Sequence, residues 1–320
     1  LRGLVGSEMC IRDRIIYCNY ESIVKIFMER KVFTNKKGEV FSYLVSKKEA
    51  SSYNFVFFHA TGFNAQTYEI LFDKLKNHFG EDISVYALDQ RGHGLSGALS
   101  DPEKLKSWDI FVEDGKEFLD SIEGNVICSG HSMGSIIAAK IASLSPEKVT
   151  HLFIIEPVLY GPLESLKFRF KSLMKINRGL SIADGAAKRR REFPSIEDAV
   201  TSYTGRGAFT TWPVSWIESY LGGGTRENES GIELSCTPEW EAATFRSSSM
   251  DTWKYLKRIK IDVMVLYGSL GSTFSAQARK ALFKLGVNWK SNYYKKASHF
   301  LPMEYSDSLV QDLETYLKEN

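Results

Sequence analysis

Short apolar runs alternate with amphipathic stretches along most of this chain, and the alternation predicts its architecture. The runs are apolar on both faces, as expected for buried parallel strands. Helix-length amphipathic stretches separate most of them, which predicts an α/β fold whose mostly parallel, doubly wound sheet is covered on both faces. The predicted strands cover 53–58, 83–88, 125–128, 149–155 and 261–267, and the predicted helices cover 66–78, 107–122, 133–144, 275–285 and 304–318.

Two intervals depart from this alternation. Between 22 and 46, two stretches rich in aromatic and β-branched residues flank the turn Asn-Lys-Lys-Gly at 35–38, which predicts an antiparallel hairpin. Between 162 and 249, polar and aromatic segments surround three consecutive glycines, and no run reads as a buried strand. We interpret 162–249 as an inserted helical cap over the carboxyl ends of the strands, with 15–161 and 250–320 forming the core.

The first fourteen residues are set apart from the fold. The segment Glu-Met-Cys-Ile-Arg-Asp-Arg at 8–14 resembles a translated sequencing-library adapter, so 1–14 are interpreted as an artefact that leaves the native N-terminus open. The four cysteines are scattered and form no Cys-x-x-Cys pair. This spacing argues against a disulfide framework and a zinc site, and a cytoplasmic location is expected.

Composition and charge narrow the class of protein. A chain of 320 residues that is 43% hydrophobic can bury a large core, and its net charge of +2 does not suggest a nucleic-acid-binding surface. We interpret the basic run Lys-Arg-Arg-Arg at 188–191 as the solvated face of a helix. No apolar run reaches the roughly 18 residues of a membrane span. The oligomeric state is left open.

One five-residue motif carries the strongest chemical signal. Gly-His-Ser-Met-Gly at 130–134 joins the strand-like run before it to the helix-like run after it. A serine on so tight a turn needs glycine two residues before it and two residues after it, because the two chain segments pass too close for a Cβ atom at these positions. Ser132 is therefore the predicted nucleophile. Since a serine hydroxyl attacks poorly at neutral pH, it needs a base within hydrogen-bond reach.

Three further motifs follow predicted strands in order: His-Ala-Thr-Gly-Phe-Asn at 59–64, Asp-Gln-Arg-Gly-His-Gly-Leu-Ser at 89–96, and Ala-Ser-His-Phe at 297–300. With the serine motif they resemble the α/β-hydrolase fold family with a cap domain, over about residues 30 to 318. The resemblance implies that His299 is the base. It also implies that the backbone N–H groups of Met133 and Thr61 form the oxyanion hole.

The third member of the expected triad departs from the commonest pattern of the family. Most relatives place the acid at the position that corresponds to Gly271, and no carboxylate occurs in 269–273. Glu156 is the best substitute, because it follows the strand 149–155 and some relatives, including certain haloalkane dehalogenases, place their acid there. Its alternative role is a structural carboxylate at the start of the cap.

Together these features imply a cofactor-independent, metal-free serine hydrolase that cleaves a small carboxylic ester, or a related acyl substrate, through an acyl-enzyme intermediate. An amidase or aminopeptidase, a lactonase and a hydrolase of carbon–carbon bonds share this machinery and stay open. A non-catalytic ligand-binding protein of the same fold also stays open, since position 271 lacks the acid.

The remaining candidates are histidines and the aromatic residues of the cap. His59 is expected to anchor the loop at 59–64, and His93 and His131 are expected to be structural. The cap aromatics either line an acyl pocket or form the core of the cap. They are Phe168, Phe170, Phe209, Trp212, Trp216 and Tyr220.

Overall fold

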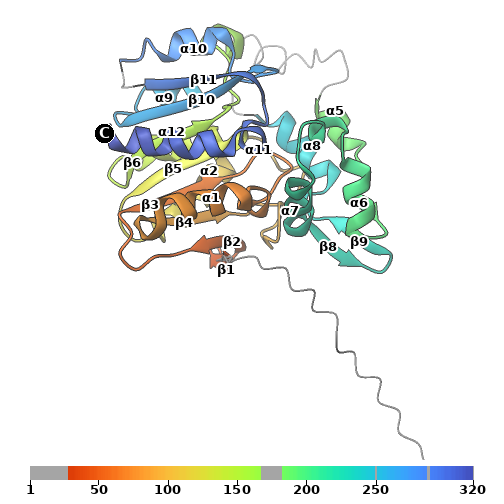
Figure 1. The fold of residues 1–320 in the computed structure, drawn as a ribbon. Coiled ribbons are helices and arrows are strands. Elements are labelled where there is room, and N and C mark those ends of the chain that lie inside the picture. The colour runs from red at the N-terminus through yellow and green to blue at the C-terminus, as the bar shows by residue number, and fades with distance from the viewer. Residues whose placement is uncertain (1–27, 167–181, 249–250, 287–288, 320) are drawn as a thin grey trace, which may run out of the picture.

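The computed structural model describes residues 28–166, 182–248, 251–286 and 289–319, so the predictions for 1–14, Phe168 and Phe170 lie outside the described residues. An eight-stranded sheet runs in the order β1-β2-β4-β3-β5-β6-β10-β11 (Figure 1). β2 pairs antiparallel with β1 and with β4, and every other neighbouring pair is parallel. The α/β fold with a mostly parallel sheet is thus confirmed.

The buried strands lie where the apolar runs predicted them. β4 and β5 are buried along their whole length, because both lie inside the sheet and most of their residues are apolar or small. The strands of this sheet are β1 (Glu29–Thr34), β2 (Val40–Ser46), β3 (Tyr53–Phe58), β4 (Ile83–Leu88), β5 (Val126–His131), β6 (Val149–Ile155), β10 (Asp262–Leu270) and β11 (Trp289–Ser298).

Helices cover both faces of this sheet and enclose two hydrophobic cores. One face carries α1 (Glu69–Phe79), α11 (Leu301–Glu304) and α12 (Ser306–Lys318), and α1 and α12 lie in front of the sheet in Figure 1. The other face carries α2 (Asp109–Asp120), α3 (Met133–Leu144), α9 (Thr252–Leu256) and α10 (Ala276–Leu282). Short 3-10 turns η1 (Ala65–Tyr68) and η2 (Gly80–Asp82) flank α1.

Residues 182–248 form a separate group of elements beside one end of the sheet (Figure 1). We call this group the cap elements: α5 (Ile182–Ala187), β7 (Glu192–Phe193), α6 (Ile196–Tyr203), η3 (Gly207–Phe209), α7 (Val214–Gly224), β8 (Thr225–Asn228), β9 (Gly231–Leu234) and α8 (Pro238–Arg246). Their three strands pair antiparallel in a small sheet of their own, which the prediction of helices alone did not include. The reason is that β8 is polar and largely solvent-facing, so it lacks an apolar run.

The cap elements are anchored on the turn at 89–96. Trp240 of α8 donates its indole N–H to the carbonyl of Arg91 at 3.0 Å. The ring also lies against Gly92, where a Cβ atom would come within 2.2 Å of the indole nitrogen. Arg91 itself is buried and forms ion pairs with Glu39 and Asp114. This motif therefore joins the hairpin, helix α2 and the cap elements at one point.

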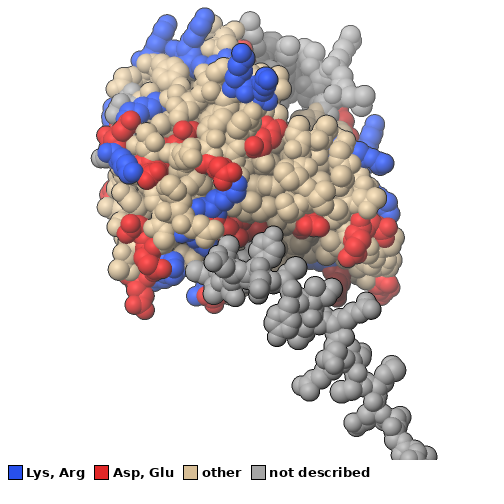
Figure 2. All heavy atoms as spheres, viewed as in Figure 1, with Lys and Arg blue, Asp and Glu red and all other residues tan. Residues whose placement is uncertain are grey.

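Charged side chains of both signs are intermixed on the face that Figure 2 shows. The basic run 188–191 follows helix α5 and is not helical, so the prediction of a helix face is wrong, although Lys188, Arg190 and Arg191 are exposed as expected. Arg189 is the exception: it turns inward, and its side chain is only 17% exposed. In the described ranges, no helix is long and apolar enough to cross a membrane.

Candidate active site

Ser132 lies on a sharp turn between strand β5 and helix α3. Its φ angle is +58°, a left-handed conformation that is uncommon for a residue with a side chain. A Cβ atom on Gly130 would lie 2.4 Å from the backbone of Gly134, and one on Gly134 would lie 1.9 Å from the carbonyl oxygen of Phe58. Both glycines of the motif are thus required by backbone atoms, which cannot move aside.

His299 lies beside this serine. It follows strand β11, and its Nε2 atom is 3.0 Å from the hydroxyl of Ser132 although 166 residues separate the two in the chain, from 133 to 298. Its Nδ1 atom is 3.2 Å from a carboxylate oxygen of Glu156. A neutral ring that donates from Nδ1 to this carboxylate has Nε2 free to accept the serine proton. The structure places the predicted base beside the predicted nucleophile, and their catalytic roles stay predictions.

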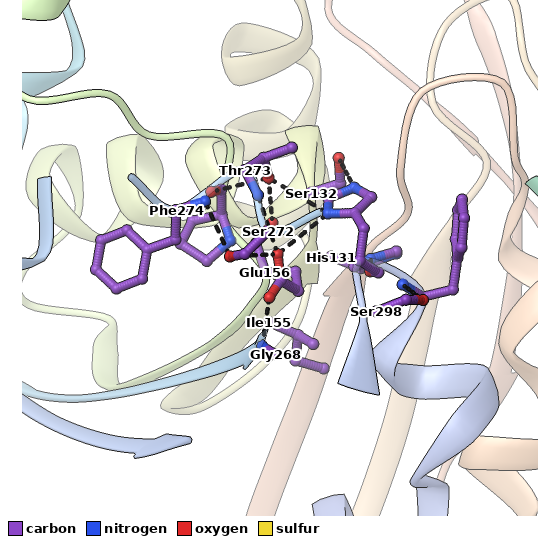
Figure 3. Close-up of polar contacts among 12 residues, drawn as sticks. His131, Ser132, Ile155, Glu156, Gly268, Ser272, Thr273, Phe274 and Ser298 are labelled. Atoms are coloured by element: carbon purple, nitrogen blue, oxygen red, sulfur yellow. Dashed lines mark hydrogen bonds and ion pairs between the residues drawn. The ribbon is translucent and has the colours of Figure 1, made fainter. Parts of the chain in front are cut away.

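Glu156 is fully buried and held by several donors from the neighbouring strand and its loop (Figure 3). One carboxylate oxygen accepts from the backbone N–H of Gly268 at 2.5 Å. The other accepts from the Ser272 hydroxyl at 3.0 Å and from the Thr273 N–H at 3.3 Å. These bonds fix the carboxylate beside His299. Sequence reasoning did not identify Ser272 and Thr273, which carry no motif.

Thr61 and Met133, the predicted oxyanion donors, lie next to each other. The Thr61 hydroxyl donates to the Met133 sulfur at 3.3 Å. Met133 is the first residue of helix α3, so its N–H has no acceptor within the helix. Thr61 lines the same cavity as Ser132. Thr61, in the loop after β3, and Met133, in the turn after β5, therefore both lie near Ser132. That their N–H groups bind the oxyanion stays a prediction.

His59 and His93 brace the loops around this site. His59 donates from Nδ1 to the Ala60 carbonyl at 2.8 Å and accepts at Nε2 from the Gln90 N–H at 2.9 Å. Burial lowers the pKa of His59 to about 4, so the ring is neutral at neutral pH. His93 is also buried, bonds the Arg91 carbonyl from Nδ1, and has its pKa lowered to about 3 mainly by burial. Neither ring contacts Ser132.

His131 connects the loop at 59–64 to His299, and sequence reasoning did not find this role. Its Nε2 atom is 2.7 Å from the backbone carbonyl of His299, and its Nδ1 atom is 2.7 Å from the Tyr68 hydroxyl. The carbonyl can only accept, so Nε2 carries the proton and Nδ1 accepts from Tyr68. The same hydroxyl accepts from the Ala60 N–H at 3.2 Å. Burial lowers the pKa of His131 well below its usual value, which keeps this tautomer neutral.

A cavity of about 730 Å³ opens beside Ser132 and His299. Apolar and small side chains from α5, η3 and α8 line much of it, including Phe209 and Phe245. Trp212 and Trp216 are not among its lining residues. They are buried in the hydrophobic core that continues from the sheet into the cap elements, where Trp212 packs on Phe63. Phe209 thus faces the cavity and the two tryptophans serve as core.

The described segments contain neither a disulfide nor a cluster of side chains suited to a metal ion. Cys128 and Cys236 are buried and free. Within those segments, no group of three or more histidine, cysteine, aspartate or glutamate side chains could hold a metal ion.

Comparison with known proteins shows which fold the chain shares with them. The family model of the S33 serine aminopeptidases matches residues 51–196, which is less than half of the chain. Among solved structures, E-2-(acetamidomethylene)succinate hydrolase superposes with a TM-score of 0.73 at 18% identity, over 91% of this chain and 99% of that one. The peroxisomal α/β-hydrolase Lpx1 of Saccharomyces cerevisiae superposes with a TM-score of 0.71 at 17% identity, over 91% of this chain and 84% of that one. The chain has the α/β-hydrolase fold.

Relatives with curated names extend over most of the chain. Protein phosphatase methylesterase 1 of Candida albicans is 25% identical over 99% of this chain and 82% of its own length. A pimeloyl-[acyl-carrier protein] methyl ester esterase of Legionella pneumophila is 20% identical over 82% of this chain and 94% of its own length. These similarities to esterases and another hydrolase support the interpretation of this chain as a hydrolase.

Proposed function

We propose that this chain is a serine hydrolase that cleaves a small carboxylic ester through an acyl-enzyme intermediate. The observation that supports this most is the continuous contact from Ser132 through His299 to Glu156, with hydrogen-bond distances of 3.0 and 3.2 Å, beside a cavity of about 730 Å³. The methyl ester esterases among its relatives favour an ester over an amide. We also propose that residues 162–249 act as the cap that closes this cavity.

In the first half of the reaction, the Ser132 hydroxyl attacks the ester carbonyl while His299 Nε2 takes its proton. The imidazolium that forms is stabilised at Nδ1 by the carboxylate of Glu156. The oxyanion of the tetrahedral intermediate accepts hydrogen bonds from the N–H groups of Met133 and Thr61. Since these backbone donors are already fixed by the fold, no reorganisation is needed during the reaction.

In the second half, His299 donates its proton to the leaving alcohol, and the carbon–oxygen bond to that alcohol breaks. Water then attacks the acyl-serine carbonyl, with His299 acting as base again, and the acid product leaves as Ser132 regains its proton. Each step uses the same hydrogen bond between the serine and the imidazole. No cofactor takes part.

The proposal is tested with p-nitrophenyl esters of increasing chain length. We expect the wild-type protein to hydrolyse the short esters, and Ser132→Ala to lose at least about 10³-fold in kcat. The matched control is Ser143→Ala, which removes a hydroxyl in helix α3 away from His299. Absence of turnover across the panel, with no labelling of Ser132 by a fluorophosphonate, would contradict the proposal.

A non-catalytic ligand-binding protein is the alternative that the missing acid at position 271 favoured. That argument weakens once a buried carboxylate, from Glu156, contacts His299 Nδ1.

A further inference from the structure

The cavity beside Ser132 also contains an arginine whose hydrogen-bond donors are only partly used. Arg189 follows helix α5 and lines this cavity. Its Nη1 atom lies 3.1 Å from one carboxylate oxygen of Glu241 and 3.4 Å from the other. Its Nε and Nη2 atoms are buried and have no hydrogen-bond partner among the described residues. A buried N–H group without an acceptor is unfavourable, so these two donors favour the binding of a group that accepts hydrogen bonds.

The Arg189–Glu241 pair lies close to the reacting groups. Glu241 belongs to helix α8, and a Cβ atom on Gly62 would come within 2.4 Å of its carboxylate. Gly62 directly follows Thr61, the predicted oxyanion donor. A group bound at Arg189 would therefore belong to the same molecule whose ester carbonyl lies at Ser132, since both residues line one cavity.

The unused edge of Arg189 has a defined shape. Nε–H and one Nη2–H point in parallel along one side of the planar guanidinium, at a spacing that fits the two oxygens of a carboxylate. Glu241 contacts only Nη1, on the other side. A neutral carbonyl would satisfy one of the two free donors, whereas a carboxylate satisfies both.

The charges around the cavity favour an anion of low charge. Its titratable lining residues are Arg189, Arg206, Glu241, Tyr203 and His299. Among the described lining residues, two arginines face one glutamate, so the formal charges of these three side chains sum to +1. A monoanionic carboxylate neutralises this charge, while a phosphate dianion would exceed it.

We propose that Arg189 binds a carboxylate carried by the substrate, so that this enzyme prefers the half-ester of a dicarboxylic acid to a neutral ester. This inference rests on the proposed ester hydrolysis. Arg189 is then a specificity-determining residue, which selects the acyl group while Ser132 and His299 perform the reaction.

The test compares monomethyl esters of straight-chain dicarboxylic acids, from succinate to sebacate, with the corresponding dimethyl esters. We expect the wild-type kcat/KM to favour the best half-ester roughly 30-fold, and Arg189→Gln to reduce this preference to near one. Arg189→Lys keeps the charge without the two-pronged edge, so an intermediate preference is expected. The matched control is Arg190→Gln, an exposed neighbour whose Nε donates to the Glu192 carbonyl, and it should keep the full preference.

A second variant separates recognition from folding. Arg189→Gln leaves the buried Glu241 without its partner, so Arg189→Gln/Glu241→Gln is measured beside it. The same half-esters and dimethyl esters are then titrated calorimetrically into Ser132→Ala, which needs no turnover. Tighter binding of the half-ester that is lost with Arg189→Gln supports the carboxylate site, even if no ester is hydrolysed by the wild-type protein and the proposed function fails.

Equal hydrolysis and equal binding of half-esters and dimethyl esters would overturn the carboxylate site and leave the proposed esterase intact. Loss of the preference in Arg190→Gln as large as in Arg189→Gln would also overturn it, because the effect would then reflect general surface charge.

Discussion

Strained backbone occurs at the residues that form the candidate site. In the described part of the chain, three non-glycine residues have positive φ angles, and two of them are Ser132 and Glu156. Each follows a parallel strand, β5 or β6, and each turns its side chain toward His299. Such conformations are unfavourable by roughly 1 to 3 kcal/mol each and persist where the surrounding structure enforces them. Here the hydrogen-bond donors around Glu156 and the close packing of Gly130 and Gly134 around Ser132 enforce these conformations.

Replacing Glu156 tests whether its carboxylate orients the imidazole. Glu156→Gln keeps the shape of the side chain but removes the charge that faces His299 Nδ1. We expect kcat for p-nitrophenyl esters to fall roughly 10³-fold with little change in KM, because the imidazolium loses its stabilising partner. Glu147→Gln, at an exposed position, is the control. Full activity in Glu156→Gln would move the acid to another residue.

Tyr68 provides a second test at this scale, because its hydroxyl joins the Ala60 N–H to His131. Tyr68→Phe leaves both buried groups without a partner, so we expect a loss of about 1 to 3 kcal/mol in the free energy of unfolding. The backbone of His299, held by His131, should also become less fixed and lower kcat more than it changes KM. Urea unfolding and ester kinetics are compared with Tyr293→Phe, which alters an exposed ring. An unchanged kcat would show that His131 does not position His299.

The close approach of helix α3 to strand β3 sets the turn at Ser132. Gly134→Ala would place a methyl group 1.9 Å from the carbonyl oxygen of Phe58, so the helix must move away from the sheet. We expect a loss of roughly 3 kcal/mol in the free energy of unfolding, or failure to fold. The control is Gly185→Ala in helix α5, where the added methyl meets no atom of the described residues within 4 Å and a change within about 1 kcal/mol is expected. Equal stability of the two variants would contradict this account of the turn.

The elements that the sequence predicted are those with a strong local signal. The inner strands β3, β4, β5, β6 and β10 could be predicted because both of their faces are buried and apolar. Ser132 and His299 could be proposed because glycines and strand ends mark the loops that carry them, and Glu156 because it directly follows β6. Their catalytic roles stay predictions.

Features that depend on partners distant in the sequence could not be predicted. Strand β8 is polar and solvent-facing, so only its pairing with β9 defines it. Arg189 stands in a run of cations that reads as solvated, and its inward direction depends on Glu241, 52 residues away. The link from His131 to His299 depends on a backbone carbonyl, which no motif encodes.

Taken as a whole, the molecule buries three histidines in neutral form, which makes its stability depend on pH. Burial lowers the pKa of His59 to about 4 and of His93 to about 3, and lowers that of His131 well below its usual value. The unfolded chain binds protons at these rings near pH 6.5, while the folded chain does not. Their contribution is therefore complete above about pH 6.5 and is lost as the pH falls toward the folded values.

Urea unfolding at pH 7 and pH 5 measures this effect. We expect His59 and His93 each to lower the free energy of unfolding by roughly 2 kcal/mol between the two pH values, and His131 to act in the same direction. His93→Gln removes one titrating ring, so its loss over the same interval should be smaller by about that amount. A pH dependence as steep in His93→Gln as in the wild-type protein would contradict the assignment of a neutral buried ring.

The central claim is that the hydroxyl of Ser132 becomes acylated, and mass spectrometry after rapid quenching tests it most directly. Wild-type protein is mixed with a p-nitrophenyl ester, quenched in acid within the first turnover and digested. We expect the acyl mass on the peptide that contains Ser132, with a burst of about one equivalent of p-nitrophenol, and neither signal in Ser132→Ala. An acyl group on a different residue, or undiminished turnover in Ser132→Ala, would contradict the account.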